Sequence, residues 1–302
     1  LVFFFPLSLS ISILFADLSA SLISLVILIL FLRKESNKLF YDIRKKIYFF
    51  FIFYLLILIS LFFSISFKDS FLPSFFYFRY FLFALGIFYL LKKYDFFKKV
   101  LLYSISLTFI IVIMDSFFQY FFLKNFFNYP SIYFYQGSDT GRVHHITSFF
   151  NDEKKLGSYL VRLLPFFISL LYFFNFKKLN YFYFAITGVV IFLTTERTAL
   201  FLFIIFSIFY FLIIKKKFQF TIFGILILSC LLIFNEGFRF KYIDYTLMQL
   251  GIVQPNWEQT IPEKKIIRYY SKEHEDFVYT AIQIFKKNVF KGSGIKTFYL
   301  AC

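Results

Sequence analysis

The chain has 302 residues, of which 60% are hydrophobic and only 17% are charged. Ordinary soluble domains are roughly 45–50% apolar and about 25% charged. The composition therefore excludes a disordered chain, a disulfide-rich secreted module and a typical soluble enzyme. Together with a mean hydropathy of +0.73, it predicts an all-α polytopic membrane protein.

Apolar runs separated by short charged clusters follow one another along the chain. They cover residues 1–15, 18–32, 48–67, 71–91, 100–122, 156–174, 179–195, 199–214 and 218–234. A spanning helix needs about 20 apolar residues, with a range of roughly 17–25. Several runs lie at or below that limit, and the first two form either a hairpin broken at Asp17 or one long broken helix. We expect about nine transmembrane helices in a domain that covers residues 1–234.

The net charge of +16 indicates the orientation of these helices. One set of loops carries 15 Lys and Arg residues, and the alternate short loops carry six. The first set comprises residues 33–47, 92–99, 175–178 and 215–217, and the second comprises residues 68–70, 123–155 and 196–198. Basic residues collect in cytoplasmic loops, so the first set is expected to be cytoplasmic. The charge then requires no nucleic-acid partner.

The same topology places residues 235–302 on the outer face, as the first part of a large outer domain. Within this stretch, apolar residues at helical spacing predict an amphipathic helix over Glu275–Val289. Gly292 and Gly294 are expected to end it. Because the chain begins at Leu1 and stops soon after these glycines, we expect it to be a fragment of a longer protein.

Three ionisable residues fall inside predicted spans, where charges are expensive and by default suggest a site. Arg79 and Asp115 lie at nearly the same depth in adjacent spans, so we expect them to pair. Their pair serves either function or helix packing. Arg162 lies near the outer end of its span, where it either serves the site or extends to the interface.

Arg197 stands in the short polar turn TTERTAL (194–200), which is predicted on the outer face. Its guanidinium can hold phosphate oxygens in a bidentate manner. The alternatives are a local pair with Glu196 or simple anchoring at the interface.

The segment GRVHHITSFFNDEKK in loop 123–155 adds Arg142 and two adjacent histidines, His144 and His145. Neighbouring residues of a strand point to opposite faces, so we expect no metal site here. His144, His145 and His274 are the visible candidates for a general base. For His274, a solvated helix start among acidic residues is the alternative.

Several arginines without an acidic metal cluster suggest a site for a large anion at the outer membrane boundary. A lipid-linked pyrophosphate has this chemistry, and arginines could neutralise the leaving pyrophosphate in place of a divalent metal. No cofactor is expected.

The segment from Asp115 to Pro165, the TTERTAL turn and the C-terminal stretch HEDFVYTAIQIFKKNVFKGSGIKTFYLAC resemble the O-antigen ligase and polymerase family of bacterial inner membranes. The resemblance implies metal-independent transfer of a glycan from undecaprenyl pyrophosphate to lipid A-core, or to a growing chain in a polymerase. It implies that Arg197 contacts the pyrophosphate in the periplasm, together with a further loop arginine, for which Arg268 is our candidate. The family's key histidine is expected beyond Cys302.

Two other function classes stay open from the sequence alone. A transporter of lipid-linked oligosaccharides would show inverted repeats and charges near the midplane. A non-catalytic membrane scaffold would use Arg79 and Asp115 for packing alone.

Overall fold

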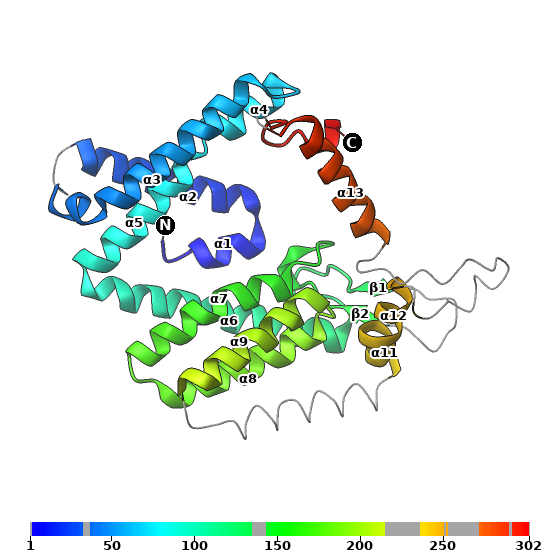
Figure 1. Ribbon diagram of the computed structural model, residues 1–302. Helices are drawn as coiled ribbons and strands as arrows, with labels where there is room; N and C mark the ends of the chain where they lie inside the picture. Colours follow the sequence, from blue (N-terminus) through cyan, green and yellow to red (C-terminus); the bar gives the residue numbers. More distant parts are fainter. Residues whose placement is uncertain are drawn as a thin grey trace. The chain divides into compact units, whose positions relative to one another are not determined.

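The computed structural model describes residues 2–32, 37–134, 143–214, 236–250, 252, 272–289 and 292–301. In this part the chain is mostly helical, as expected, with one short two-stranded sheet. It divides into two compact units (Figure 1). Unit 1 comprises residues 1–5, 13–98 and 269–302, and unit 2 comprises residues 6–12 and 99–268. These boundaries differ from the predicted division after residue 234.

Unit 1 combines the helices of the N-terminal third with the end of the chain. Its helices are α2 (Ile13–Leu32), α3 (Asn37–Phe62), α4 (Phe67–Phe75), α5 (Phe78–Lys93), α13 (Lys272–Lys287) and α14 (Phe298–Ala301). Helices α2 and α5 pack so closely that a Cβ on Gly86 of α5 would lie only 2.7 Å from Cγ1 of Ile27 on α2. The absence of a side chain at Gly86 permits this approach. Ser24 of α2 also donates a 2.6 Å hydrogen bond to the carbonyl of Arg79.

Unit 2 holds the remaining elements, including all but the first residue of α1 and all but the first turn of α6. In chain order these are α1 (Phe5–Ile11), α6 (Asp95–Phe122), β1 (Ile132–Phe134), β2 (Val143–His145), η1 (Ser148–Phe150), α7 (Leu156–Phe173), α8 (Lys177–Leu193), α9 (Arg197–Ile214), α11 (Glu236–Arg239), the π-helical segment η2 (Phe240–Asp244) and α12 (Tyr245–Gln249). Strands β1 and β2 are antiparallel, with Ile132 opposite His145. Helices α7, α8 and α9 lie side by side (Figure 1).

Helix α7 shows how the sequence builds the core of unit 2. Its fully buried residues recur every three or four positions and form one apolar stripe, which comprises Leu156, Leu160, Leu164, Phe167 and Leu171. The Phe167 ring packs 4.8 Å from both Phe109 of α6 and Tyr183 of α8, measured between ring centroids. This packing fixes α7, which begins at the candidate site, against α6 and α8.

The structure does not support the prediction of about nine transmembrane helices. Within the described residues, four helices or helix pairs are long and apolar enough to cross a membrane. They are Ile13–Leu30, Phe67–Lys93, Asp95–Phe122 and Leu156–Phe173. Two shorter apolar helices cover Ile47–Phe62 and Arg197–Ile213. The composition and these helices together identify a membrane protein.

The sequence count was too high because not every apolar run forms one long helix. The first run yields only the seven-residue α1, and the helix breaks at Ser12, whereas Asp17 lies inside α2. Helix α8 has 17 residues, and α3 begins within the basic cluster, so its apolar part is short. The predicted span at 218–234 lies outside the described residues.

The amphipathic helix predicted over Glu275–Val289 is confirmed as α13, which begins three residues earlier and ends two residues earlier. Gly292 and Gly294, which follow it, have φ angles of +69° and +96°. Only glycine adopts such angles without strain.

Candidate functional site

The TTERTAL turn is the centre of the candidate site in unit 2. Helix α8 ends at Leu193, α9 begins at Arg197, and the three residues between them are buried. Thr195 has a φ of +58°, which is a genuine outlier for a β-branched residue. Its hydroxyl contacts Nδ1 of His145, and the carbonyl of Thr194 lies 3.4 Å from the same nitrogen. Strand β2 therefore holds the turn in this strained conformation.

The carboxylate of Glu196 binds the start of α7. It accepts hydrogen bonds from the backbone nitrogens of Gly157 (2.7 Å) and Ser158 (3.0 Å) and from the Ser158 hydroxyl (2.9 Å). These backbone nitrogens are donors that a helix N-terminus leaves unsatisfied, and the positive end of the helix dipole favours the negative charge. Burial raises the pKa of the Glu196 carboxyl, while these bonds and the charge of Arg162 oppose that shift.

Arg197 binds a different element. Its Nη1 donates to the Thr246 hydroxyl at 3.0 Å, and its Nη2 donates to Oε1 of Gln249 at 2.6 Å, both on α12. The guanidinium lies 5.2 Å from the centre of the Tyr245 ring. In the part of the chain that the structure describes, no carboxylate lies within ion-pair distance of Arg197. The local pair with Glu196, one of the alternatives that the sequence left open, is therefore wrong.

Two lysines that the sequence did not single out add positive charge: Lys241, on which the charge of Arg197 acts, and Lys154, whose charge also acts on Lys241. Lys241, in the π-helical segment η2, is only 6% exposed, and its Nζ lies 4.6 Å from the centre of the Tyr245 ring. Burial, followed by the charges of Lys154 and Arg197, lowers the pKa of Lys241 to about 8. The amine therefore stays mostly protonated at pH 7. We call Lys154, Arg197 and Lys241 the basic junction.

The sequence contains only a weak indication that Lys241 belongs to the site. Lys241 stands four residues before Tyr245, a spacing that places two side chains on one face of a helix. Its neighbour in space, Arg197, is 44 residues earlier, and only tertiary packing brings the two together. Short π-helical segments are rare and often occur at functional sites, which marks η2 as part of the site.

Asp115 anchors the start of loop 123–155 on α6. Its Oδ2 accepts a 2.5 Å hydrogen bond from the Ser148 hydroxyl, and its Oδ1 accepts a 2.7 Å bond from the nitrogen of Phe126. One turn later, Oε1 of Gln119 accepts from the backbone nitrogens of Thr147 and Ser148. These buried bonds hold the segment that leads from His145 to α7.

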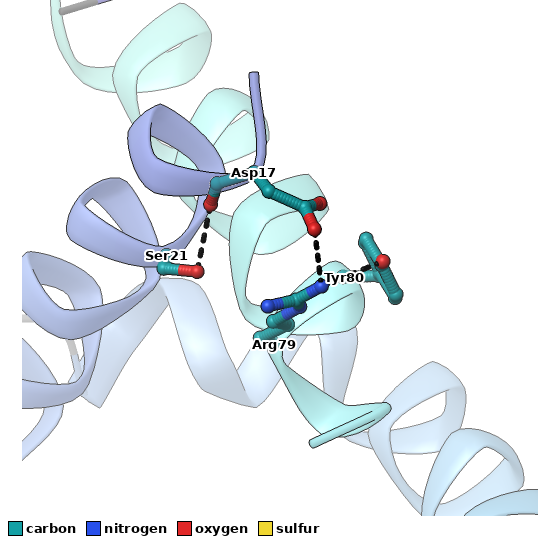
Figure 2. Close-up of polar contacts among 4 residues, drawn as sticks. All are labelled: Asp17, Ser21, Arg79 and Tyr80. Carbon is teal, nitrogen blue, oxygen red and sulfur yellow. Dashed lines mark hydrogen bonds and ion pairs between the residues drawn. The ribbon is translucent and has the colours of Figure 1, made fainter. Parts of the chain in front are cut away.

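Arg79 has a partner in its own unit, Asp17, which the sequence did not predict, and the expected partner Asp115 belongs to the other unit. Figure 2 shows Nη2 of Arg79 on α5 within 2.9 Å of both Oδ2 of Asp17 on α2 and the Tyr80 hydroxyl. The carbonyl of Asp17 accepts a further bond from the Ser21 hydroxyl. The pairing differs from the prediction because α5 packs along α2.

The other predicted site residues are dispersed. Arg162 is exposed on α7, near enough to Glu196 for its charge to act there. His144 lies 3.0 Å from the Ser131 hydroxyl, away from the partners of His145, as expected for neighbours on a strand. His274 is exposed in the first turn of α13 in unit 1.

Two predicted pyrophosphate ligands, Arg142 and Arg268, lie outside the described residues. Among the residues that are described, no group of three or more His, Cys, Asp or Glu side chains is arranged to hold a metal ion.

A comparison with models of known protein families, with curated proteins and with solved structures finds no match to this chain. The resemblance to O-antigen ligases and polymerases, and the role it implies for Arg197, stay predictions.

His145 is part of the frame that holds the TTERTAL turn. His145 is only 2% exposed, and burial, with the charges of Lys154 and Lys241, lowers its pKa to about 4. Its imidazole is therefore neutral at pH 7. A general base works best with a pKa near the working pH, so His145 is better suited to positioning the turn than to taking a proton.

Proposed function

We propose that the chain belongs to a membrane glycosyltransferase that moves an O-antigen-type glycan from undecaprenyl pyrophosphate to lipid A-core, without a metal ion. The site would face the periplasm at the bacterial inner membrane. The observation that carries this proposal is the environment of Arg197, a guanidinium held by the neutral side chains of Thr246 and Gln249 and within electrostatic range of Lys241.

The reaction makes a specific demand on such a site. The oxygen of the acceptor hydroxyl forms a bond to the anomeric carbon of the glycan and gives its proton to a general base. The bond from that carbon to the pyrophosphate oxygen breaks, and negative charge develops on the leaving pyrophosphate. Preorganised cations stabilise that charge most strongly in the transition state. Arg197 supplies a planar fork of donors for two oxygens, and Lys241 and Lys154 supply point charges.

The surrounding contacts explain how Arg197 would stay in place. Glu196 is committed to α7, so it does not neutralise its neighbour. Thr246 and Gln249 orient the guanidinium without cancelling its charge. An anion that entered the basic junction would therefore meet a fixed guanidinium whose charge no carboxylate among the described residues balances at ion-pair distance.

The test uses the full-length protein in cells that depend on it for glycan attachment. Arg197→Ala should abolish attachment of glycan to lipid A-core while the protein still reaches the membrane. Arg197→Lys should also lose most activity, because an ammonium cannot replace a bidentate fork. The matched control is Arg239→Ala, since Arg239 is half exposed and lies 4.0 Å from Asp244.

Gel analysis of lipopolysaccharide and an immunoblot of the membrane fraction give the two readouts. Normal attachment in the Arg197→Ala strain would overturn the assignment of Arg197. Lipid A-core that still carries single glycan units, but no long chains, would indicate a polymerase with the same donor.

A further inference from the structure

Helix α13 presents an apolar face that the rest of the described chain leaves exposed. At 100° per residue, six apolar residues fall on one side of the helix: Phe277, Val278, Ala281, Ile282, Ile284 and Phe285. Phe277 and Phe285 are each 62% exposed, although the Phe277 ring lies 6.5 Å from that of Phe298. The opposite side carries Asp276, Gln283 and Lys287, so the helix is strongly amphipathic.

The segment that follows α13 is fixed to the turn between α3 and α4. The carbonyl of Ser293 accepts a 3.0 Å hydrogen bond from the nitrogen of Ile65, and the carbonyl of Ile295 accepts a 2.8 Å bond from the buried Ser70 hydroxyl. The contact is so close that a Cβ on Gly294 would lie 2.1 Å from Oγ of Ser64. The α3–α4 turn therefore holds the segment Ser293–Ile295, which follows α13.

The α3–α4 turn joins the shorter apolar helix Ile47–Phe62 to a candidate membrane span. The apolar part of α3 ends at Phe62, and the candidate span Phe67–Lys93 begins five residues later. Helix α13 ends at Lys287, and the next contact of the chain with this turn is made by Ser293. A bilayer that these two apolar segments enter would have its surface near this turn, and the exposed apolar face of α13 could then reach the lipids.

The charges of α13 divide along its length, with Glu273, Glu275 and Asp276 near its start and two lysines at the end that leads to the α3–α4 turn. Lys286 and Lys287 occupy its last turn, where they can approach lipid phosphates. Amphipathic helices with one apolar face, a charged opposite face and low overall hydrophobicity lie in the membrane interface, with the apolar face about 5–10 Å into the boundary between head groups and acyl chains.

We propose that α13 lies in the surface plane of an anionic membrane as an interfacial helix, with the side formed by Phe277, Ala281 and Phe285 inserted between the lipids. This inference does not rest on glycan transfer. It assigns a lipid surface to a segment that the sequence predicted only as part of a water-exposed outer domain.

The experiment uses the full chain, with Cys230→Ser and Cys302→Ser, reconstituted in vesicles of phosphatidylethanolamine and phosphatidylglycerol. Single cysteines then carry a nitroxide spin label. Three positions sample the apolar side (Val278→Cys, Ala281→Cys and Phe285→Cys), and three matched controls sample the polar side (Asp276→Cys, Gln283→Cys and Lys287→Cys). All six residues are solvent-accessible or partly so, so the substitutions should not disturb folding.

Collision of the label with oxygen, which concentrates in lipid, is compared with collision with a water-soluble nickel chelate. We expect oxygen to dominate on the apolar side and the chelate to dominate on the polar side. Vesicles without phosphatidylglycerol should shift the apolar labels toward the water phase.

Two results would overturn the proposal. Equal access of the chelate to all six labels would mean that α13 lies free in water. Labels at Val278, Ala281 and Phe285 that are shielded from both reagents would mean that protein, either another copy or another partner, covers the apolar side.

Discussion

The carboxylate of Glu196 accepts a 2.7 Å hydrogen bond from the backbone nitrogen of Gly157, 39 residues earlier in the chain. The next residue, Arg197, binds α12 about 50 residues later. Two adjacent residues of one turn thus connect the start of α7 to the segment after α9. The turn is rigid because both of its charged side chains are committed to neighbouring elements.

Replacing the Glu196 carboxylate should weaken the start of α7. Glu196→Gln keeps the size of the side chain but loses the charge and one of two acceptor oxygens, so one buried donor of Gly157 or Ser158 is left poorly satisfied. We expect a loss of about 1–3 kcal/mol in the free energy of unfolding. Thermal unfolding in detergent, followed by the helical circular dichroism signal, measures it.

The control for that experiment is Glu153→Gln. The Glu153 side chain is 52% exposed and pairs with Lys155 at the surface, so its loss should change stability by less than about 1 kcal/mol. Equal effects of the two substitutions would contradict the capping role of Glu196.

His145 should make the protein sensitive to acid. Its pKa is about 4 in the folded protein and about 6.5 when unfolded, so the unfolded chain binds a proton more readily between these values. The contribution to stability is complete above pH 6.5 and is lost as the pH falls toward 4, by up to about 3 kcal/mol. The unfolding temperature of the wild type should therefore fall more steeply between pH 7 and 4.5 than that of His145→Asn.

Carboxylates also titrate in this pH range, so the effect of His145 is measured by the difference between the wild type and His145→Asn. Parallel curves for the wild type and His145→Asn would show that His145 is accessible to protons in the folded state.

The sequence predicted the elements of this fold better than their contacts. Apolar periodicity identified α13, and the polar break at TTERTAL located the end of α8 and the start of α9 within a few residues. Both predictions succeeded because these features depend on local sequence pattern. The sequence did not predict the partner of Arg79, because depth along a helix does not reveal which helix lies beside it. Asp17 was interpreted only as a break in an apolar run, yet it carries the ion pair.

The residues of the candidate site show the same difference: local sequence pattern revealed some of them, and only tertiary contacts revealed the others. Arg197 could be selected from the sequence because it stands in a short polar turn between two apolar runs, where a charged side chain suggests a site. Lys241 could not, because a lysine in a polar segment is ordinary until tertiary packing buries it beside Tyr245 and within range of Arg197. Contacts between residues about 40 to 50 positions apart leave no local pattern in a single sequence.

The ion pair between Arg79 and Asp17 should couple α2 to α5. In a double-mutant cycle with Arg79→Gln and Asp17→Asn, we expect an interaction energy of about 0.5–3 kcal/mol in detergent. The pair Lys98–Asp95 serves as the comparison, since it lies within one helix and the Asp95 side chain is 96% exposed. Additive effects of the two substitutions would show that Arg79 and Asp17 do not interact in solution.

Close packing at Gly294 should make this position intolerant of any side chain. Gly294→Ala would place a Cβ against Ser64 and Ser70, whereas Gly292→Ala meets no atom within 4 Å. Both glycines have positive φ, but +69° at Gly292 lies in the left-handed region that alanine can adopt at some cost, whereas +96° at Gly294 lies outside it. Gly294→Ala therefore adds both the clash and a larger backbone strain. Limited proteolysis after α13 should be faster in Gly294→Ala than in Gly292→Ala. Equal rates would contradict the docking of this segment on the α3–α4 turn.

The basic junction predicts that Arg197 and Lys241 influence each other's charge. Burial is the first cause of the lowered pKa of Lys241, and the charges of Lys154 and Arg197 add to it. Arg197→Gln removes one of those charges while keeping a polar side chain beside Thr246, so the pKa of Lys241 should rise from about 8 toward its ordinary value. Mass spectrometry after amine modification over a range of pH reports the midpoint for this lysine. Arg239→Gln is the control and should leave that midpoint unchanged, because Arg239 is not among the charges that lower it. A midpoint that does not move in Arg197→Gln would mean that the two cations do not share one site, and the pyrophosphate proposal would lose its electrostatic basis.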